Sequence, residues 1–125
     1  MNYLIVFLGG GLGATLRHAF NIFGASLMNT NAPIGTLTIN VAGCLLMGLM
    51  AGYFAFKGNI SQRFRLFLMT GFMGGFTTFS AFSVEVVSMI ERSQYYSALV
   101  YGLLTLIISI GATFIGLNLV RILSR

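Results

Sequence analysis

The chain has 125 residues, of which 57% are hydrophobic and only 7% are charged, with a formal net charge of +5. So few charges cannot cover the surface of a soluble domain of this size, and the mean hydropathy of +0.91 indicates an integral membrane protein in a lipid bilayer. The basic residues are scattered at the ends of apolar segments, which indicates contact with lipid headgroups and predicts no nucleic-acid partner.

Four apolar segments each exceed the roughly 20 residues that a helix needs to cross a bilayer. They predict four transmembrane helices over residues 3–26, 33–56, 65–90 and 95–120, in a single all-α domain that covers 1–125. Both termini and the central link then share one side, which carries five basic residues against two on the other and is therefore expected to be cytoplasmic. This bias is small enough to leave insertion in both orientations open. The five residues are Lys57, Arg63, Arg65, Arg121 and Arg125.

In the first span, Gly9, Gly13 and Arg17 recur every four residues and share one helix face. Small residues at this spacing are typical of a close helix–helix contact, and an arginine at the end of a span commonly reaches the headgroups. The alternative is that Arg17 lines a basic vestibule that concentrates anions.

In the second span, Thr36, Asn40 and Gly43 lie on one face. An asparagine inside the membrane must face the protein interior. Asn40 is therefore expected either to form an interhelical hydrogen bond or to line a pore as a donor, and the sequence leaves both roles open.

The third span contains a glycine pair, Gly74 and Gly75, followed by a run of hydroxyl residues. We expect the pair to break the helix near its middle. Irregular backbone at membrane depth persists only where protein, a wet cavity or an ion satisfies its polar groups. This pattern therefore predicts ion handling.

Behind the glycine pair, Phe79 and Phe82 lie three residues apart, with Ser80 beside them and Glu85 as the acidic group inside the span. Phenylalanines at this spacing usually only pack, but the positive edge of a phenyl ring also attracts a small anion without trapping it. Glu85 is expected either to reach an interface or basic partner or to serve in the ion path.

In the fourth span, Tyr101, Thr105 and Ser109 follow one helix face, with Thr113 next in register. Such hydroxyls either bond back to the preceding helical turn or form a polar track along a pore. Hydroxyl donors without fixed charge suit an anion that must shed water and leave quickly.

Other kinds of site find no support in the sequence. The single cysteine, Cys44, excludes an intrachain disulfide and is expected to pack as a small apolar residue. The sequence offers no spacing for zinc, haem or iron–sulfur ligands, and no nucleophile–base pair, paired carboxylates or phosphate-binding loop. We therefore do not expect an enzyme.

Together these motifs closely resemble the Fluc/CrcB family of bacterial fluoride channels. The resemblance covers all four spans in order, and its most specific part is the Gly-Gly-Phe-Thr-Thr-Phe-Ser-Ala-Phe-Ser run. The matching segments are residues 9–14 with Arg17, residues 35–37 with Asn40 and Gly43, and residues 74–83 followed by Glu85.

The resemblance implies a passive, fluoride-selective channel that exports fluoride across the bacterial plasma membrane as an antiparallel, dual-topology homodimer. It also implies a structural sodium ion at the dimer centre, held by the main-chain carbonyls of Gly74 and Thr77. The implied pore residues are Asn40, Phe79, Phe82, Ser80, Tyr101, Thr105 and Ser109, and Thr36 is counted with them because it shares the face of Asn40.

Two other functions compete with this interpretation. A proton-coupled exporter of the small multidrug-resistance type also has four spans, but it needs a membrane-embedded carboxylate, and only Glu85 would be available. A non-transporting accessory subunit would explain the glycine stripes and leave the serial hydroxyls unexplained.

Overall fold

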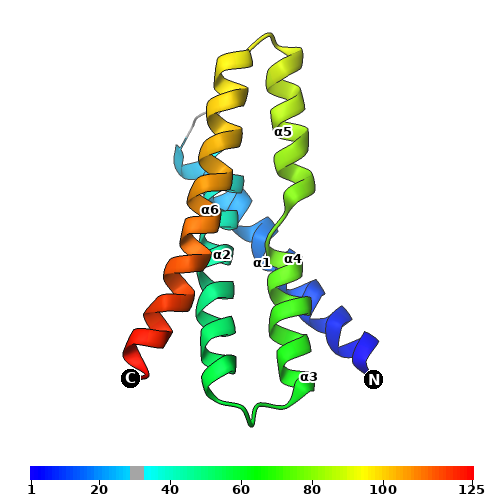
Figure 1. The fold of residues 1–125 in the computed structure, drawn as a ribbon. Coiled ribbons are helices and arrows are strands. Elements are labelled where there is room, and N and C mark those ends of the chain that lie inside the picture. The colour runs from blue at the N-terminus through cyan, green and yellow to red at the C-terminus, as the bar shows by residue number, and fades with distance from the viewer. Residues whose placement is uncertain (29–32) are drawn as a thin grey trace.

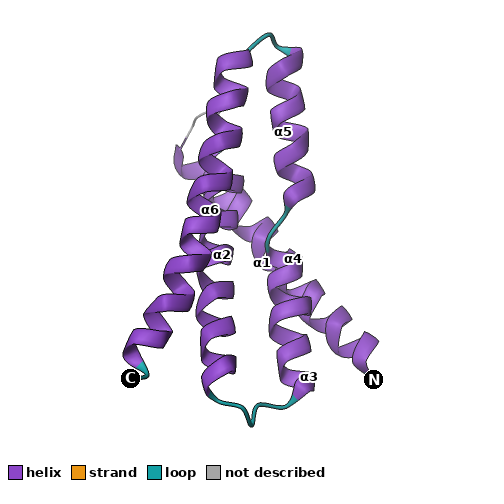
Figure 2. Cartoon of the chain, viewed as in Figure 1, coloured by secondary structure: helices purple, strands orange, loops and turns teal. Residues whose placement is uncertain are grey.

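The computed structural model describes the chain except for residues 29–32, and its described part is built from helices and short connections (Figures 1 and 2). The elements in chain order are α1 (Asn2–Met28), α2 (Ile34–Phe56), α3 (Gln62–Arg65), the π-helix η1 (Leu66–Met73), α4 (Gly74–Phe76), α5 (Phe79–Glu91) and α6 (Tyr95–Leu123).

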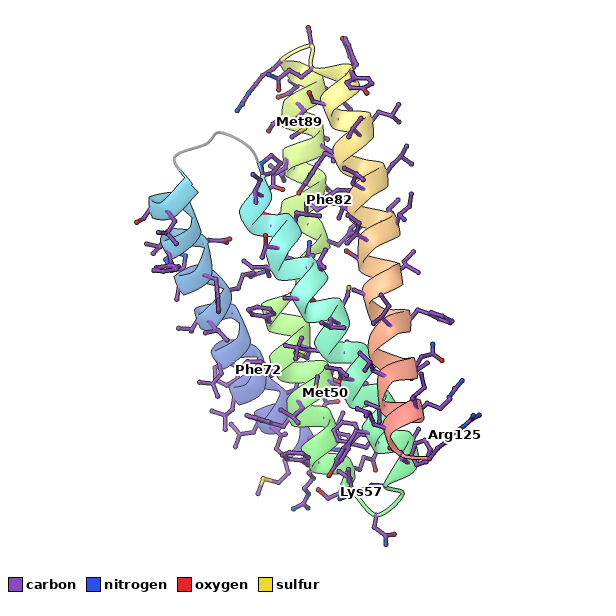
Figure 3. The ribbon with its side chains drawn as sticks, turned by 90° about the vertical axis from the view of Figure 1, so that its left-hand side faces the viewer. Met50, Lys57, Phe72, Phe82, Met89 and Arg125 are labelled. Carbon is purple, nitrogen blue, oxygen red and sulfur yellow. The ribbon has the colours of Figure 1, made fainter. Side chains whose placement is uncertain are left out.

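Four helical stretches are long and apolar enough to cross a membrane, which confirms the four predicted spans. The third stretch combines α3, η1, α4 and α5, and it runs over Gln62–Glu91. Both termini and the link between α2 and α3 lie at the same end of the molecule (Figure 1). Lys57 and Arg125 mark this end, and Met89 lies toward the opposite end (Figure 3).

Glycines allow α1 to cross η1 and α4 at very short range. A Cβ atom on Gly13 would overlap the carbonyl group of Phe72, and one on Gly75 would overlap the carbonyl oxygen of Gly10. Backbones in close contact gain dispersion energy that lipid cannot supply. The packing role expected for Gly9 and Gly13 is therefore confirmed.

A second glycine contact joins α2 to α6. A Cβ atom on Gly48 would overlap the carbonyl of Thr113, and one on Gly116 would lie too close to the backbone of Leu45 and Leu49. The two contacts hold α1 and α6 to different partners: α1 packs mainly on η1 and α4, whereas α6 packs mainly on α2 and α5.

The third span is broken near its middle, but not where the sequence indicated. Gly74 and Gly75 are helical, and the break lies at Thr77 and Thr78, whose backbones are extended. The prediction that the glycine pair interrupts the helix is therefore wrong. Gly75 is required by the approach of Gly10, and helical geometry keeps the local backbone paired inside the membrane. The π-helix just before the pair was not predicted either; such elements are frequent at functional sites.

Candidate functional site

Asn40 holds the break by pairing with one residue of the extended segment. Its Nδ2 donates to the carbonyl oxygen of Thr78 at 2.9 Å, and the Thr78 N–H donates to Asn40 Oδ1 at 2.8 Å. The amide side chain thus makes the two hydrogen bonds with the N–H and C=O of Thr78 that a neighbouring strand makes in a sheet. The interhelical hydrogen bond expected of Asn40 is confirmed, and one Nδ2 hydrogen remains for another acceptor.

Two further features shape the break. Gly43 lies against it, because a Cβ atom there would overlap the side-chain methyl of Thr77. The Thr78 hydroxyl then accepts the N–H of Ala81 at 3.2 Å and so caps the start of α5. Since the Thr78 N–H is bound to Asn40, it does not continue the helical ladder to the carbonyl of Gly74. Gly74 itself is exposed, and a Cβ atom there would meet no atom closer than 4.0 Å.

A cavity of about 230 Å³ lies beside the break, between α2, α5 and α6. None of its lining residues is Lys, Arg, Asp, Glu or His, so we call it the neutral cavity. It is lined by Asn40, Cys44, Thr77, Thr78, Phe79, Phe82, Thr105, Leu106, Ser109 and Ile110.

Two hydroxyls on the α6 wall of the neutral cavity are unpaired. Thr105 Oγ1 and Ser109 Oγ are buried and have no hydrogen-bond partner in the described part of the chain, and Thr105 is only 5% exposed. Thr113, one turn further on, instead donates to the carbonyl of Ser109 at 3.2 Å. The predicted bond to the preceding turn is therefore formed by Thr113, whereas the hydroxyls of Thr105 and Ser109 have no such partner in the described residues.

Aromatic rings form the α5 wall of the same cavity. The ring centroids of Phe79 and Phe82 are 5.5 Å apart, and those of Phe82 and Tyr101 are 5.3 Å apart. The rings are tilted at 54° and 50°, so they do not stack face to face. Phe82 is 8% exposed, whereas Phe79 is 72% exposed on the outside of the single chain. Phe82 lies on α5 between the break and Met89 (Figure 3).

A larger cavity of about 570 Å³ lies on the other side of the break, between α1 and α5. We call it the charged cavity because Arg17, His18 and Glu85 line it, together with Ala14, Asn21, Thr78, Ser80, Ala81 and Val84. Arg17 also approaches the carbonyl of Thr77, with Nη1 at 3.5 Å from the oxygen. Thr78 lines both cavities and separates them.

Glu85 ties together three helices in a way the sequence analysis did not foresee. Thr36 Oγ1 donates to one carboxylate oxygen and the Tyr101 hydroxyl donates to the other, each at 2.6 Å. The distance of each residue from the end of its helix could have indicated this contact. Glu85 and Tyr101 lie equally far from the turn between α5 and α6, and Thr36 lies near the start of α2.

The predicted site residues other than Gly74 therefore fall into three groups. The neutral cavity gathers Asn40, Thr77, Phe79, Phe82, Thr105 and Ser109. The charged cavity takes Arg17, Ser80 and Glu85, and the Ser80 hydroxyl lies 3.2 Å from that of Thr78. The hydroxyls of Thr36 and Tyr101 are bound to Glu85, and neither residue lines the neutral cavity. Gly74 lines neither of the two cavities.

Known proteins resemble the chain along nearly its whole length. A family model described as "CrcB-like protein, Camphor Resistance (CrcB)" matches residues 4–117. The chain is 50% identical over 121 residues to "Fluoride-specific ion channel FluC 2" of Nitrobacter hamburgensis, covering 97% of this chain and 98% of that protein.

Two further relatives carry a similar name. The chain is 52% identical over 121 residues to "Fluoride-specific ion channel FluC" of Rhodopseudomonas palustris, covering 97% of this chain and 98% of the relative. Identity is 46% over 125 residues to the protein of that name from Granulibacter bethesdensis, covering 100% and 98% of the two chains. These relatives are named as channels and not as enzymes. The chain thus belongs to the CrcB-like family, as a multi-pass protein of the bacterial inner membrane.

Proposed function

We propose that this protein is a passive, fluoride-selective channel that lets fluoride leave the cytoplasm. The observation that carries the proposal is the neutral cavity, which is lined by Phe79, Phe82, Thr105 and Ser109, and in which the two buried hydroxyls have no partner among the described residues. The names of the relatives support fluoride as the permeant ion.

The chemistry of the neutral cavity suits the passage of a small anion. A fixed positive charge would bind fluoride tightly and slow its release, whereas hydroxyls and the edges of aromatic rings attract it weakly. Thr105 and Ser109 offer two donors one helical turn apart, and the remaining Nδ2 hydrogen of Asn40 offers a third. Fluoride thus replaces its lost hydration with several weak contacts in succession.

The charged cavity serves as the vestibule in this proposal. Arg17 raises the local concentration of anions there, while the oxygens of Glu85 are held by the hydroxyls of Thr36 and Tyr101. Thr78 borders both cavities and marks the point where the ion passes from one to the other.

The channel is proposed to be an antiparallel homodimer. Four spans are too few to enclose a polar path and shield it from lipid, and a two-fold dimer is the commonest closed assembly. The exposed ring of Phe79 and the exposed backbone of Gly74 give a second copy a surface to cover.

The break also fits the structural sodium ion that the family resemblance implies. The Thr78 N–H, which would bond to the Gly74 carbonyl in a continuous helix, is bound to Asn40 instead. The Thr77 carbonyl belongs to extended backbone, and among the described residues its one side-chain contact is with Arg17 at 3.5 Å. These two carbonyls from each copy would hold the ion. When bound, the ion supplies positive charge that pairs these oxygens at the subunit contact.

A matched pair of variants tests the assembly. Gly74→Val adds a side chain where this chain has room, so we expect the subunit to fold but to dimerise poorly and to lose its sodium-dependent thermal stability in detergent. The control, Thr77→Ser, keeps the carbonyl and should behave as the wild type. A Gly74→Val protein with normal dimers and normal sodium dependence would remove this site from the account.

The geometry of Glu85 argues against the proton-coupled exporter. One of its oxygens accepts a hydrogen bond from Thr36 and the other from Tyr101, and these two contacts fix the carboxyl group between three helices. An exporter of that type needs a carboxylate that exchanges its proton for substrate.

Purified protein in liposomes tests the function. We expect fluoride to leave loaded liposomes down its gradient when a potassium ionophore balances charge, with chloride retained under the same conditions. Equal release of fluoride and chloride, or no release of either by folded protein, would contradict the proposal.

A further inference from the structure

We propose that Cys44 is a modification site in the wall of the ion path, at which small uncharged thiol-reactive electrophiles close the channel. The inference rests on the proposed function only for its effect on flux. Whether the thiol reacts in the folded protein is a separate question with its own measurement.

Cys44 lies where a small molecule in the neutral cavity could reach it. It follows Asn40 by four residues on α2, and both residues line the neutral cavity. The thiol is free and the residue is only partly buried. Cys44, which the sequence led us to expect as a small packed apolar residue, thus also borders the neutral cavity.

The opposite wall shows that this cavity is built to meet a ligand. Thr105, 5% exposed, and Ser109 line the cavity, and the hydroxyl oxygens of both are buried without a hydrogen-bond partner in the described residues. Buried polar groups normally have partners, so these two indicate space that water or an ion occupies. A reagent that follows the same path reaches the thiol.

The size of the cavity decides what an adduct does. The open volume of about 230 Å³ exceeds by several times the roughly 30 Å³ that one water takes up in the liquid. A methylthio group therefore fits on Cys44. Once attached, it places an apolar methyl between α2 and the hydroxyls of α6, where the ion would need donors. An apolar constriction in a narrow path stops conduction by excluding water.

The reaction with methyl methanethiosulfonate is balanced. The Cys44 sulfur attacks the methylthio sulfur, a new S–S bond forms, and the S–S bond of the reagent breaks. Methanesulfinate leaves and the thiol proton passes to water. Dithiothreitol reverses the adduct by thiol–disulfide exchange, releasing methanethiol and restoring the thiol.

The chain is suited to this test because Cys44 is its single cysteine. Wild-type protein in liposomes is treated with methyl methanethiosulfonate, and the adduct is counted by intact-protein mass spectrometry. We expect one adduct per chain, a fall in fluoride efflux of about tenfold, and recovery after dithiothreitol. Cys44→Ala, treated in the same way, should keep the efflux of its own untreated sample.

A second variant copies the adduct permanently. The side chain of methionine differs from methylthio-cysteine by one CH₂ in place of a sulfur, so Cys44→Met should show low efflux that neither reagent changes. Full labelling with unchanged wild-type efflux would overturn the proposal, as would labelling that occurs only after denaturation. Absence of efflux before treatment would contradict the proposed function instead, while labelling of the folded protein would still support the site.

Discussion

The two cavities on either side of the break differ in charge although one residue, Thr78, lines both. The charged cavity holds Arg17, His18 and Glu85, whereas the neutral cavity holds only uncharged donors, aromatic rings and apolar side chains. Capture of an anion benefits from long-range charge, but rapid passage requires weak contacts. In the proposed channel, these two tasks therefore fall on different sides of one broken helix.

The origin of this division is the pairing of Asn40 with Thr78. It turns the chain out of the helix for two residues, and this displaces α5 from α4 so that both cavities form beside the break. Changes at this point should affect both cavities, and changes further away should affect only one.

The largest effect is expected from Asn40→Leu, which keeps the side-chain size but leaves the N–H and C=O of Thr78 unpaired. Each unpaired buried group costs about 1–3 kcal/mol, so fluoride efflux should vanish and thermal stability in detergent should fall. Asn118→Leu is the matched control, because Asn118 is only partly buried and its Nδ2 donates to the Phe114 carbonyl of its own helix, away from the break. A folded Asn40→Leu protein with normal efflux would separate the break from the function.

The next largest effect is expected from Phe82→Ile and Phe79→Ile, which keep bulk and remove the ring edge. We expect efflux to fall about tenfold in each, with dimers intact. Phe72→Ile is the control, because Phe72 stacks on Phe76 away from the neutral cavity. Equal efflux in all three variants would reduce both cavity phenylalanines to packing residues.

A smaller effect on efflux is expected from Thr105→Val, without the loss of stability that usually accompanies a core substitution. The exchange removes an unpaired buried hydroxyl, so stability should stay the same or rise while fluoride efflux drops severalfold. Thr113→Val is the contrast, because it removes a hydroxyl that already bonds to the Ser109 carbonyl, and efflux should not change. If Thr105→Val were less stable, the hydroxyl would have a structural partner and no role as a free donor.

The smallest effect is expected from Arg17→Gln in the charged cavity. Loss of this charge should lower efflux at low fluoride and low ionic strength and should matter little at high salt, where the field is screened. Efflux measured over a range of salt concentrations tests this. A loss of efflux that is independent of salt would mean that Arg17 stabilises the break through its contact with Thr77 and does not act by attracting anions.

Much of the fold follows from the sequence because lipid imposes simple rules. Apolar length predicted the four spans, and spacing alone predicted the close contacts of Gly9 and Gly13. The position of the break did not follow. Local propensity points to Gly74 and Gly75, whereas the structure breaks the helix where Asn40 can pair with Thr78, a contact between residues 38 apart in sequence.

The candidate site was also predicted only in part, because helical spacing shows which residues share a face but not which contacts form between helices. Asn40, Phe82, Thr105 and Ser109 meet as expected because helical spacing places them on facing sides. Thr36 and Tyr101 could not be placed by spacing, since their direction is set by the carboxylate of Glu85 on another helix. Their part in the pore stays a prediction.

The central claim is that fluoride passes through a path of neutral donors without coupling to protons, and a planar bilayer tests it most directly. With a fluoride gradient across the membrane and equal pH on both sides, the current should reverse at the fluoride equilibrium potential. The reversal potential should stay there when a pH gradient or a chloride gradient is added. A reversal potential that moves with the pH gradient, or that follows chloride, would contradict the account.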